Sequence, residues 1–169
     1  MRSLATRGLK GVRGRGDIAT GQKLHRIEMT GFQQGPVKRH GWPSHGIGLT
    51  PDERKIWVTD GDNQHLHVFD TTVMPPTQLA SIKVRDEPGW ITFTIDGRYA
   101  YPSTGDVIEA ASKKIITTLT DETETPVMSE KMLEIQFQDD KVVHTGDQFG
   151  VGRTRATGGM RRAACPKAK

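Results

Sequence analysis

Cysteine, aromatic residues and long apolar runs are all scarce in this sequence of 169 residues. The single cysteine, Cys165, cannot form a disulfide within the chain and leaves the redox compartment open. No run approaches the roughly 18 consecutive apolar residues that a membrane-spanning helix needs, and no apolar stretch after Met1 resembles a signal peptide. The sequence therefore predicts a soluble chain with no membrane partner and no export signal.

Aromatic residues make up only 6% of the chain, beside 19 glycines and 9 prolines. Glycine and proline destabilise helix interiors, so this composition argues against a helical bundle and predicts frequent turns. A content of 34% hydrophobic and 26% charged residues is ordinary for a globular domain, and the length fits about one domain with a core.

Acidic residues are absent from both ends of the chain, residues 1–16 and 153–169. These ends hold eleven Lys and Arg, so the remaining basic residues in 17–152 are outnumbered by the 20 Asp and Glu of the chain. The net charge of +4 therefore belongs to the ends, and the middle is acidic. An acidic body repels phosphate backbones, so we do not expect a nucleic-acid partner for it.

Both ends are rich in Gly and Arg and poor in large apolar residues, a composition that cannot offset the entropy of ordering. We predict that 1–16 and 153–169 are disordered basic tails. Two functional alternatives remain for them: an RNA-binding arm around Gly14-Arg15-Gly16, or an organelle transit peptide at the acid-free N-terminus.

The middle of the sequence repeats itself, because residues 46–62 align without a gap over residues 90–106. The offset is constant at 44 residues, and the two copies match in residue type at a series of positions. The matched pairs are Asp52 with Asp96, Arg54 with Arg98, Trp57 with Tyr101, Thr59 with Ser103, and Gly61-Asp62 with Gly105-Asp106.

Each repeat has the pattern of four short strands. In the first repeat, 65–70 alternates with the period of two of a strand whose two faces are differently solvated. Four strands in about 40 to 45 residues is the period of a β-propeller blade. The strands expected in the first repeat are 46–50, 55–60, 65–70 and 78–84.

The flanks of the repeats resemble incomplete blades. Residues 17–29 are typical of the last turn and outer strand of a preceding unit, and 131–146 of the last two strands of a following unit. We therefore predict an all-β fold: a partial β-propeller in 17–152, with complete blades near 46–84 and 90–120 and two partial blades. Closed propellers have about four to eight blades, so we expect open sheet edges that pair with remaining blades or with another copy of the chain.

Several motifs resemble the YVTN-type β-propeller repeat of bacteria and archaea. Trp57-Val58-Thr59-Asp60 is followed by Gly61-Asp62-Asn63 and His67-Val68-Phe69-Asp70-Thr71, and Leu49-Thr50-Pro51-Asp52 is similar to the "SPDG" turn of that repeat. The resemblance covers about residues 17–152. It implies a propeller of about seven blades, related to lactonase-like and quinoprotein-dehydrogenase-like propellers, in a family often found in the periplasm or outside the cell. With fewer blades than that, the chain is expected to be a C-terminal fragment of a larger propeller; its own localisation stays open.

The candidate ligand-binding residues lie in loops that enter the two repeats. His40 and His45 bracket Gly41-Trp42-Pro43-Ser44, and loops at one end of a propeller commonly line its central site. We predict a ligand-binding site from two such loops, with Trp42, Ser44 and His45 in the first and Asp86 and Glu87 in the second.

A metal site has only weak candidates in this sequence. His65 and His67 lie two apart on one strand, as two ligands of zinc or copper could, but the pattern offers no third ligand and favours a solvent-facing pair. The segment 60–63 begins like a calcium loop but lacks its later glycine and glutamate, which favours a hairpin turn. We therefore expect no metal and no cofactor.

Catalytic motifs are weaker still. Ser44 is one residue out of register for a nucleophile elbow, and the tryptophans Trp42, Trp57 and Trp90 fit packing between blades better than a ligand cage. The sequence favours a non-catalytic module that binds a protein or a small ligand. Two alternatives remain: a wall of a lactonase-like or quinoprotein-dehydrogenase-like enzyme, and nucleic-acid binding by the tails.

Overall fold

The computed structural model describes residues 2–6, 12–33, 44–130, 132–146 and 152–154. Within these ranges every regular element is a β-strand, and no helix is long and apolar enough to cross a membrane. The strands are β1 (Arg2–Thr6), β2 (Val12–Asp17), β3 (Lys23–Glu28), β4 (Ile47–Leu49), β5 (Lys55–Asp60), β6 (His65–Asp70), β7 (Thr77–Lys83), β8 (Ile91–Phe93), β9 (Tyr99–Pro102), β10 (Asp106–Glu109), β11 (Lys114–Thr118), β12 (Ile135–Gln138), β13 (Lys141–Gly146) and β14 (Gly152–Thr154).

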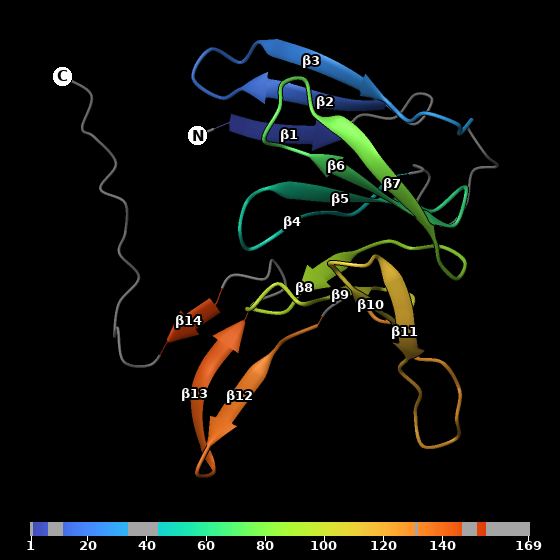
Figure 1. Ribbon diagram of the computed structural model, residues 1–169, viewed down its shortest axis with the longest axis vertical. Coiled ribbons are helices and arrows are strands. Elements are labelled where there is room, and N and C mark those ends of the chain that lie inside the picture. Colours follow the sequence, from blue (N-terminus) through green and yellow to red (C-terminus); the bar gives the residue numbers. More distant parts are fainter. Residues whose placement is uncertain (1, 7–11, 34–43, 131, 147–151, 155–169) are drawn as a thin grey trace.

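The strands form four antiparallel sheets that follow one another along the chain (Figure 1). Two sheets have four strands, β4-β5-β6-β7 and β8-β9-β10-β11, and each pairs its strands in chain order. The three-stranded sheets β1-β2-β3 and β12-β13-β14 precede and follow them. The prediction of two complete four-stranded blades between two partial blades is confirmed.

A threonine and an aspartate close the first turn of both four-stranded sheets in the same way. Thr50 Oγ1 donates to Asp52 Oδ1 at 2.6 Å, and Thr94 Oγ1 donates to Asp96 Oδ1 at 2.6 Å. These hydroxyl donors, followed by the backbone N–H two residues after each aspartate, hold the pKa of both carboxyls below its ordinary value. The turn residue after the aspartate has a positive φ in both copies, Glu53 at 59° and Gly97 at 72°. The repeat found in the sequence is therefore a repeat of hydrogen bonds.

The same spacing extends to the last sheet, because β4, β8 and β12 begin at Ile47, Ile91 and Ile135, 44 residues apart. An equivalent backbone bond closes each first hairpin: Thr59 N to Gly46 O, Ser103 N to Trp90 O, and Gly146 N to Glu134 O. Residues 131–146 therefore begin a third unit, which corrects their assignment to the last two strands of a blade. The repeat is hidden there because the β12–β13 turn uses Asp139 and Asp140, with φ of 49° and 58°, in place of the earlier turn sequence.

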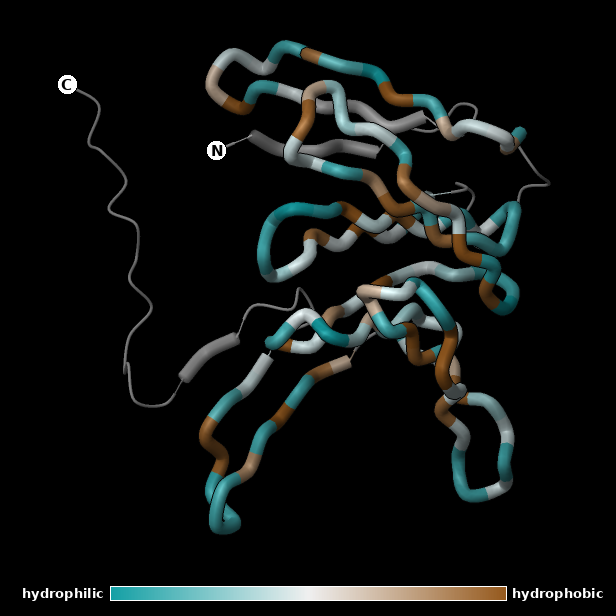
Figure 2. The backbone as a smooth tube through the Cα atoms, viewed as in Figure 1, coloured by the Kyte–Doolittle hydropathy of each residue, from teal (hydrophilic) through white to brown (hydrophobic). Residues whose placement is uncertain are grey.

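The first four-stranded sheet is buried on both faces. On one face Trp57, Leu66 and Val68 pack with Ile91 and Phe93 of the second sheet, and the rings of Trp57 and Phe93 meet edge to face at 5.6 Å. On the other face Ile56, Val58 and Phe69 pack with Ile27, Met29 and Phe32 from and after β3. Figure 2 shows the apolar segments of the two four-stranded sheets where these sheets face each other.

Double-sided burial corrects one expectation from the sequence. The alternation in 65–70 predicted one solvated face, but residues 66 to 69 are all buried. A neighbouring sheet covers each face, so the alternation separates two kinds of packed surface, one apolar and one partly polar. The expectation that Trp57 packs between blades is confirmed.

Parts of the two predicted tails lie within the described residues. Residues 2–6 and 12–17 form β1 and β2, which pair with each other and with β3. In the C-terminal tail, 152–154 form β14, and residues 155–169 lie outside the described residues.

Candidate functional site

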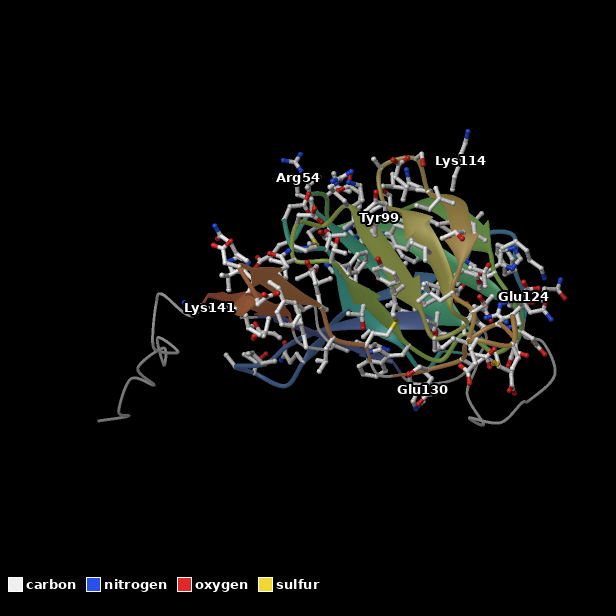
Figure 3. The ribbon with its side chains drawn as sticks, turned by 90° about the horizontal axis from the view of Figure 1, so that it is seen from below. Arg54, Tyr99, Lys114, Glu124, Glu130 and Lys141 are labelled. Atoms are coloured by element: carbon white, nitrogen blue, oxygen red, sulfur yellow. The ribbon has the colours of Figure 1, made fainter. Side chains whose placement is uncertain are left out.

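The loops predicted to carry the site lie at one end of the sheets. Each antiparallel strand reverses direction, so the segments before β4 and before β8 lie at the same end as the turns after β5 and after β9. We call this end the loop end. The opposite end carries the turns after β4, β6, β8 and β10, and we call it the turn end. Figure 3 shows Arg54 and Lys114 at the turn end, and Glu124 and Glu130 on the opposite side of the molecule.

Ser44 is a buried structural residue of the loop end. Its hydroxyl donates to the backbone oxygen of Thr59 at 2.5 Å, and only 7% of the residue is exposed. The Thr59 hydroxyl accepts a hydrogen bond from Gly46 N at 2.8 Å, which fastens the loop to β5. In the second repeat Ser103 Oγ accepts from the equivalent Trp90 N at 3.2 Å, and also from Gly89 N at 2.8 Å. Ser44 therefore holds the loop in place.

His45 is exposed and joins the entry loops of the two sheets. Its Nδ1 lies 3.1 Å from the backbone oxygen of Gly89, and its ring meets that of Trp90 edge to face, with centroids 6.4 Å apart. A Cβ on Gly46 would lie 2.6 Å from that same Gly89 oxygen and 2.7 Å from Trp90 Cα, so glycine permits this contact. The structure thus brings the loop of His45 against the loop that carries Asp86 and Glu87.

Asp86 and Glu87 lie further along the second loop, beside the turn after β5. Asp86 Oδ1 accepts from Gln64 Nε2 at 3.0 Å and from the backbone N–H of Glu87 at 3.0 Å. Gln64 Oε1 in turn accepts from Lys83 Nζ at 2.7 Å. Asp86 is exposed and Glu87 is half-buried, with a φ of 54°. Trp42, the remaining predicted residue, lies outside the described residues.

The described part of the loop end carries an excess of acidic side chains. The basic side chains among its described residues are Lys83 and Arg85, and Arg85 is engaged with Val127 O and Asp106. Several of these acidic side chains are buried. They still contribute to the electrostatic field at the loop end, because the low dielectric of the protein interior weakens solvent screening of their charge. The acidic residues are Asp60, Asp62, Asp86, Glu87, Asp106, Asp121, Glu122, Glu124 and Glu130.

A buried polar chain that the sequence analysis missed lies between the first two sheets. His67 is fully buried; its Nε2 lies 3.1 Å from Asp60 Oδ2 and its Nδ1 2.8 Å from Ser81 Oγ. Gln78 Nε2 donates to Ser81 Oγ at 2.9 Å, and Gln78 Oε1 accepts from Thr30 N at 2.8 Å. These bonds connect the loop end of β5 with the segment after β3.

These contacts correct the expectation of a solvent-facing histidine pair. The rings of His65 and His67 stack at 6.1 Å, and Phe32 meets them edge to face at 4.7 and 4.6 Å. Both ring nitrogens of His67 are engaged by Asp60 and Ser81, so metal binding there would break existing bonds. Within the described ranges no group of three His, Cys, Asp or Glu side chains could hold a metal ion.

The carboxyl of Asp60 experiences opposing effects on its pKa. Burial raises the pKa, but hydrogen bonds from His67 and from the side chain and backbone of Asn63 outweigh burial and hold the pKa below its ordinary value. Asp60 Oδ1 accepts from Asn63 N at 3.0 Å, which is the geometry of a hairpin turn. The expected turn at 60–63 is confirmed.

Strand pairing is the signal that would have located the polar chain. His67 lies directly opposite Ser81 in the β6–β7 ladder, and Asp60 lies diagonally from His67 in the β5–β6 ladder. Cross-strand neighbours on one face interact. Thr30 and Gln78, however, are 48 residues apart and meet only through the packing of two sheets.

Comparisons with known proteins identify the fold and no family. No protein-family model matches the sequence, and no match was found among the curated proteins. The solved structures that resemble the chain include a functionally unknown protein from Desulfotomaculum acetoxidans (TM-score 0.58, 17% identity, 78% of this chain and 39% of that one). They also include Kuenenia stuttgartiensis hydrazine synthase (TM-score 0.56, 16% identity, 85% of this chain and 43% of that one) and the dihydro-heme d1 dehydrogenase NirN in complex with DHE (TM-score 0.51, 12% identity, 69% of this chain and 24% of that one).

These neighbours support a propeller-like fold for the chain. At such low identity the likeness concerns the fold alone. The chain spans about two fifths of the length of the first two proteins and about a quarter of the third.

Proposed function

We propose that this chain is a β-propeller binding module of the YVTN-repeat type, part of a larger propeller, whose loop end binds a positively charged protein segment or small ligand. The observation that supports this most is the excess of acidic side chains around two joined entry loops. A field of one sign attracts oppositely charged partners and raises their association rate. The repeated turns around Asp52 and Asp96 support the repeat type.

Ligand contacts in this proposal come from the exposed parts of the two loops. His45 offers an imidazole beside the ring of Trp90, and Asp86 and Glu87 offer carboxylates that accept from ammonium or guanidinium groups. Trp42 belongs to the same predicted site. Ser44 contributes by holding the loop that carries His45.

The test measures binding of a short Lys- and Arg-rich peptide, and of a charge-reversed Asp- and Glu-rich peptide, to the full chain by fluorescence anisotropy. We expect saturable binding of the basic peptide that weakens as salt rises, because salt screens exposed charges. The double variant Asp86→Asn/Glu87→Gln is expected to weaken binding by about three- to tenfold.

The matched control is Asp139→Asn/Asp140→Asn, which removes two carboxylates in the turn between β12 and β13, outside the loop end. It is expected to leave peptide affinity unchanged. Equal binding of the acidic peptide, or an equal loss of affinity in the control variant, would contradict the proposal.

A hydrolase, as in lactonase-like propellers, is the second candidate, and the polar chain is the observation that favours it. Ser81, hydrogen-bonded to His67 and through it to Asp60, lines a groove of about 520 Å³ together with Ile27, Phe69 and Gln78. Activation of a serine hydroxyl by a histidine that a carboxylate orients is a recurrent arrangement for acyl transfer. It ranks second because His67 is fully buried and Ser81 Oγ already accepts from Gln78.

A fluorophosphonate probe distinguishes the two candidates. A hydrolase is expected to be labelled at Ser81, to lose labelling in Ser81→Ala, and to lose it on heat unfolding. A binding module is expected to bind the basic peptide without any labelling.

A further inference from the structure

The free edge of β12 lacks the protection that other edge strands have. β12 pairs with β13 on one side and has no strand partner on the other side among the described residues. Sheets usually protect such an edge with lysines, with short strands or by cover. The outer edge strands β3, β7 and β11 each carry a lysine, and the inner edge strands β4 and β8 have three residues each. The sequence of β12, Ile-Gln-Phe-Gln, has no charge, and the strand is exposed along its whole length.

An apolar stripe, formed by Leu133, Ile135 and Phe137, lies along the same strand. These residues alternate with polar ones, so their side chains share one face. All three are exposed, whereas Ile91 and Phe93, 44 positions before Ile135 and Phe137, are buried against the first four-stranded sheet. The last sheet therefore repeats a packing surface that the described residues leave uncovered.

The preceding sheet offers a smaller apolar face than the one that covers Ile91 and Phe93. In the first four-stranded sheet that cover comes from Trp57 and from the six-residue strand β6. In the second, Tyr101 stands at the position of Trp57, and the equivalent strand β10 has four residues. The cover of the apolar stripe therefore has to come from outside the described residues of one chain.

The backbone of β12 presents its open hydrogen-bonding groups at the apolar positions. Glu134 O accepts from Gly146 N of β13, so the backbone groups of Glu134 and Gln136 face β13. Backbone direction alternates along a strand, so the N–H and C=O groups of Ile135 and Phe137 point to the free edge. A strand added there would meet open backbone groups and apolar side chains together.

We propose that the added strand is β12 of a second copy of the chain, which pairs antiparallel about a two-fold axis at Gln136. β12 itself has the chemistry that the edge requires, because it is uncharged and apolar at every second residue. In this register Ile135 of each copy lies opposite Phe137 of the other, and the two Gln136 side chains meet on the opposite face. Glu134 lies opposite Gln138. The interface thus gains two apolar cross-strand pairs and no pair of like charges.

Charge and the two faces of the strand favour this register. A shift by one residue would place Glu134 opposite Asp139 and apolar side chains opposite glutamines, because successive side chains lie on opposite faces. Antiparallel pairing also places the loop ends of the two copies at opposite ends of the dimer. The interface is therefore independent of the peptide site proposed above.

Size exclusion with light scattering on the full chain tests the proposal, and a dimer is expected. Ile135→Asp and Phe137→Lys are each expected to give a monomer. The double variant Ile135→Asp/Phe137→Lys is expected to restore the dimer, because an acid of each copy then lies opposite a base of the other. Ile116→Asp, at an exposed apolar position on β11, is the control and is expected to stay dimeric. A monomeric unsubstituted chain, a dimer that survives both single substitutions, or a double variant that stays monomeric would overturn the proposal.

A disulfide reports the position of the two-fold axis. Cys165→Ser removes the single cysteine of the chain, and Gln136→Cys then places one thiol of each copy at the axis. Opposite residues of a non-hydrogen-bonded antiparallel pair have Cα atoms about 4.5 Å apart, within reach of a disulfide. Oxidation is expected to give a covalent dimer. Gln138→Cys, on the same strand and face, is the matched control and is expected to stay unlinked; equal linking of the two variants would overturn the register.

Discussion

Gly46 permits the contact between the two entry loops, because it has no Cβ. A methyl group there would lie 2.6 Å from Gly89 O and 2.7 Å from Trp90 Cα, and both are backbone atoms that cannot move aside as a flexible side chain can. The loops carry His45 on one side and Asp86 and Glu87 on the other. A single glycine therefore fixes the spacing of the proposed binding residues.

Gly46→Ala is expected to lower the free energy of unfolding by about 1–3 kcal/mol, as overpacking of a close contact does. Urea unfolding followed by circular dichroism measures the change. Gly16→Ala is the control, because its Cβ would meet only Gln22 O at an ordinary 3.5 Å. An equal midpoint shift in the two variants would show that the close approach is unimportant.

Because of Asp60, the free energy of unfolding is expected to depend on pH in the acid range. Its pKa in the folded state lies below the ordinary value, so its contribution is present above the unfolded pKa of about 3.9 and is lost as pH falls through the folded pKa. Urea unfolding at pH 7 and pH 3 is expected to show less loss of stability in Asp60→Asn than in the unsubstituted chain. An identical loss in both proteins would contradict this role.

At the scale of secondary-structure elements, Phe32 connects the first sheet to the first complete blade by packing. It follows β3 and packs edge to face on His65 and His67 of β6, in the same interface as Ile27 and Met29. Neighbouring blades bury each other's faces, so the stability of a strand depends on the sheet beside it. The polar chain through Ser81 and Gln78 crosses the same interface.

Phe32→Ala is expected to destabilise the fold by about 2–4 kcal/mol, because it removes most of an aromatic side chain from this interface. Hydrogen exchange of β3 and β6 amides is expected to accelerate more than that of β9 and β10. Leu79→Ala, at a position that is 48% exposed, serves as the control with a small expected effect. Uniform acceleration across all sheets would show that the interface is not a local unit.

On the scale of the whole molecule, the last sheet is poorly covered. The first four-stranded sheet is buried on both faces, whereas all four residues of β12 are exposed. Leu133, Ile135 and Phe137 expose 69%, 49% and 64% of their surface. Exposed apolar surface and open sheet edges favour association with further strands, which remaining propeller blades or a second copy would supply.

The full chain is therefore expected to self-associate, and Phe137→Asp is expected to reduce its mass in size exclusion with light scattering. Ile18→Asp, at another exposed position in the β2–β3 turn, is expected to leave the mass unchanged. A monomeric unsubstituted chain with a sharp unfolding transition would contradict this expectation.

Local rules in the sequence were enough to determine the repeated blade. The matched Asp52 and Asp96, the glycine-rich turns and the strand lengths predicted two four-stranded sheets, because hydrogen bonds between near neighbours depend only on spacing along the chain. The third unit escaped detection because its turn has a different sequence and a different backbone conformation: Asp139 and Asp140 both have a positive φ, whereas each earlier first turn has one such residue.

Tertiary structure alone decided the environment of each face and each loop. His67 looked solvent-facing in the sequence and is buried, because Phe32 reaches it from a sheet whose position no local pattern encodes. In the same way, the contact of His45 with Gly89, 44 residues away, arises where two sheets pack together. Spacing along the chain determines strands and turns, whereas burial, pairing and pockets depend on which sheets become neighbours.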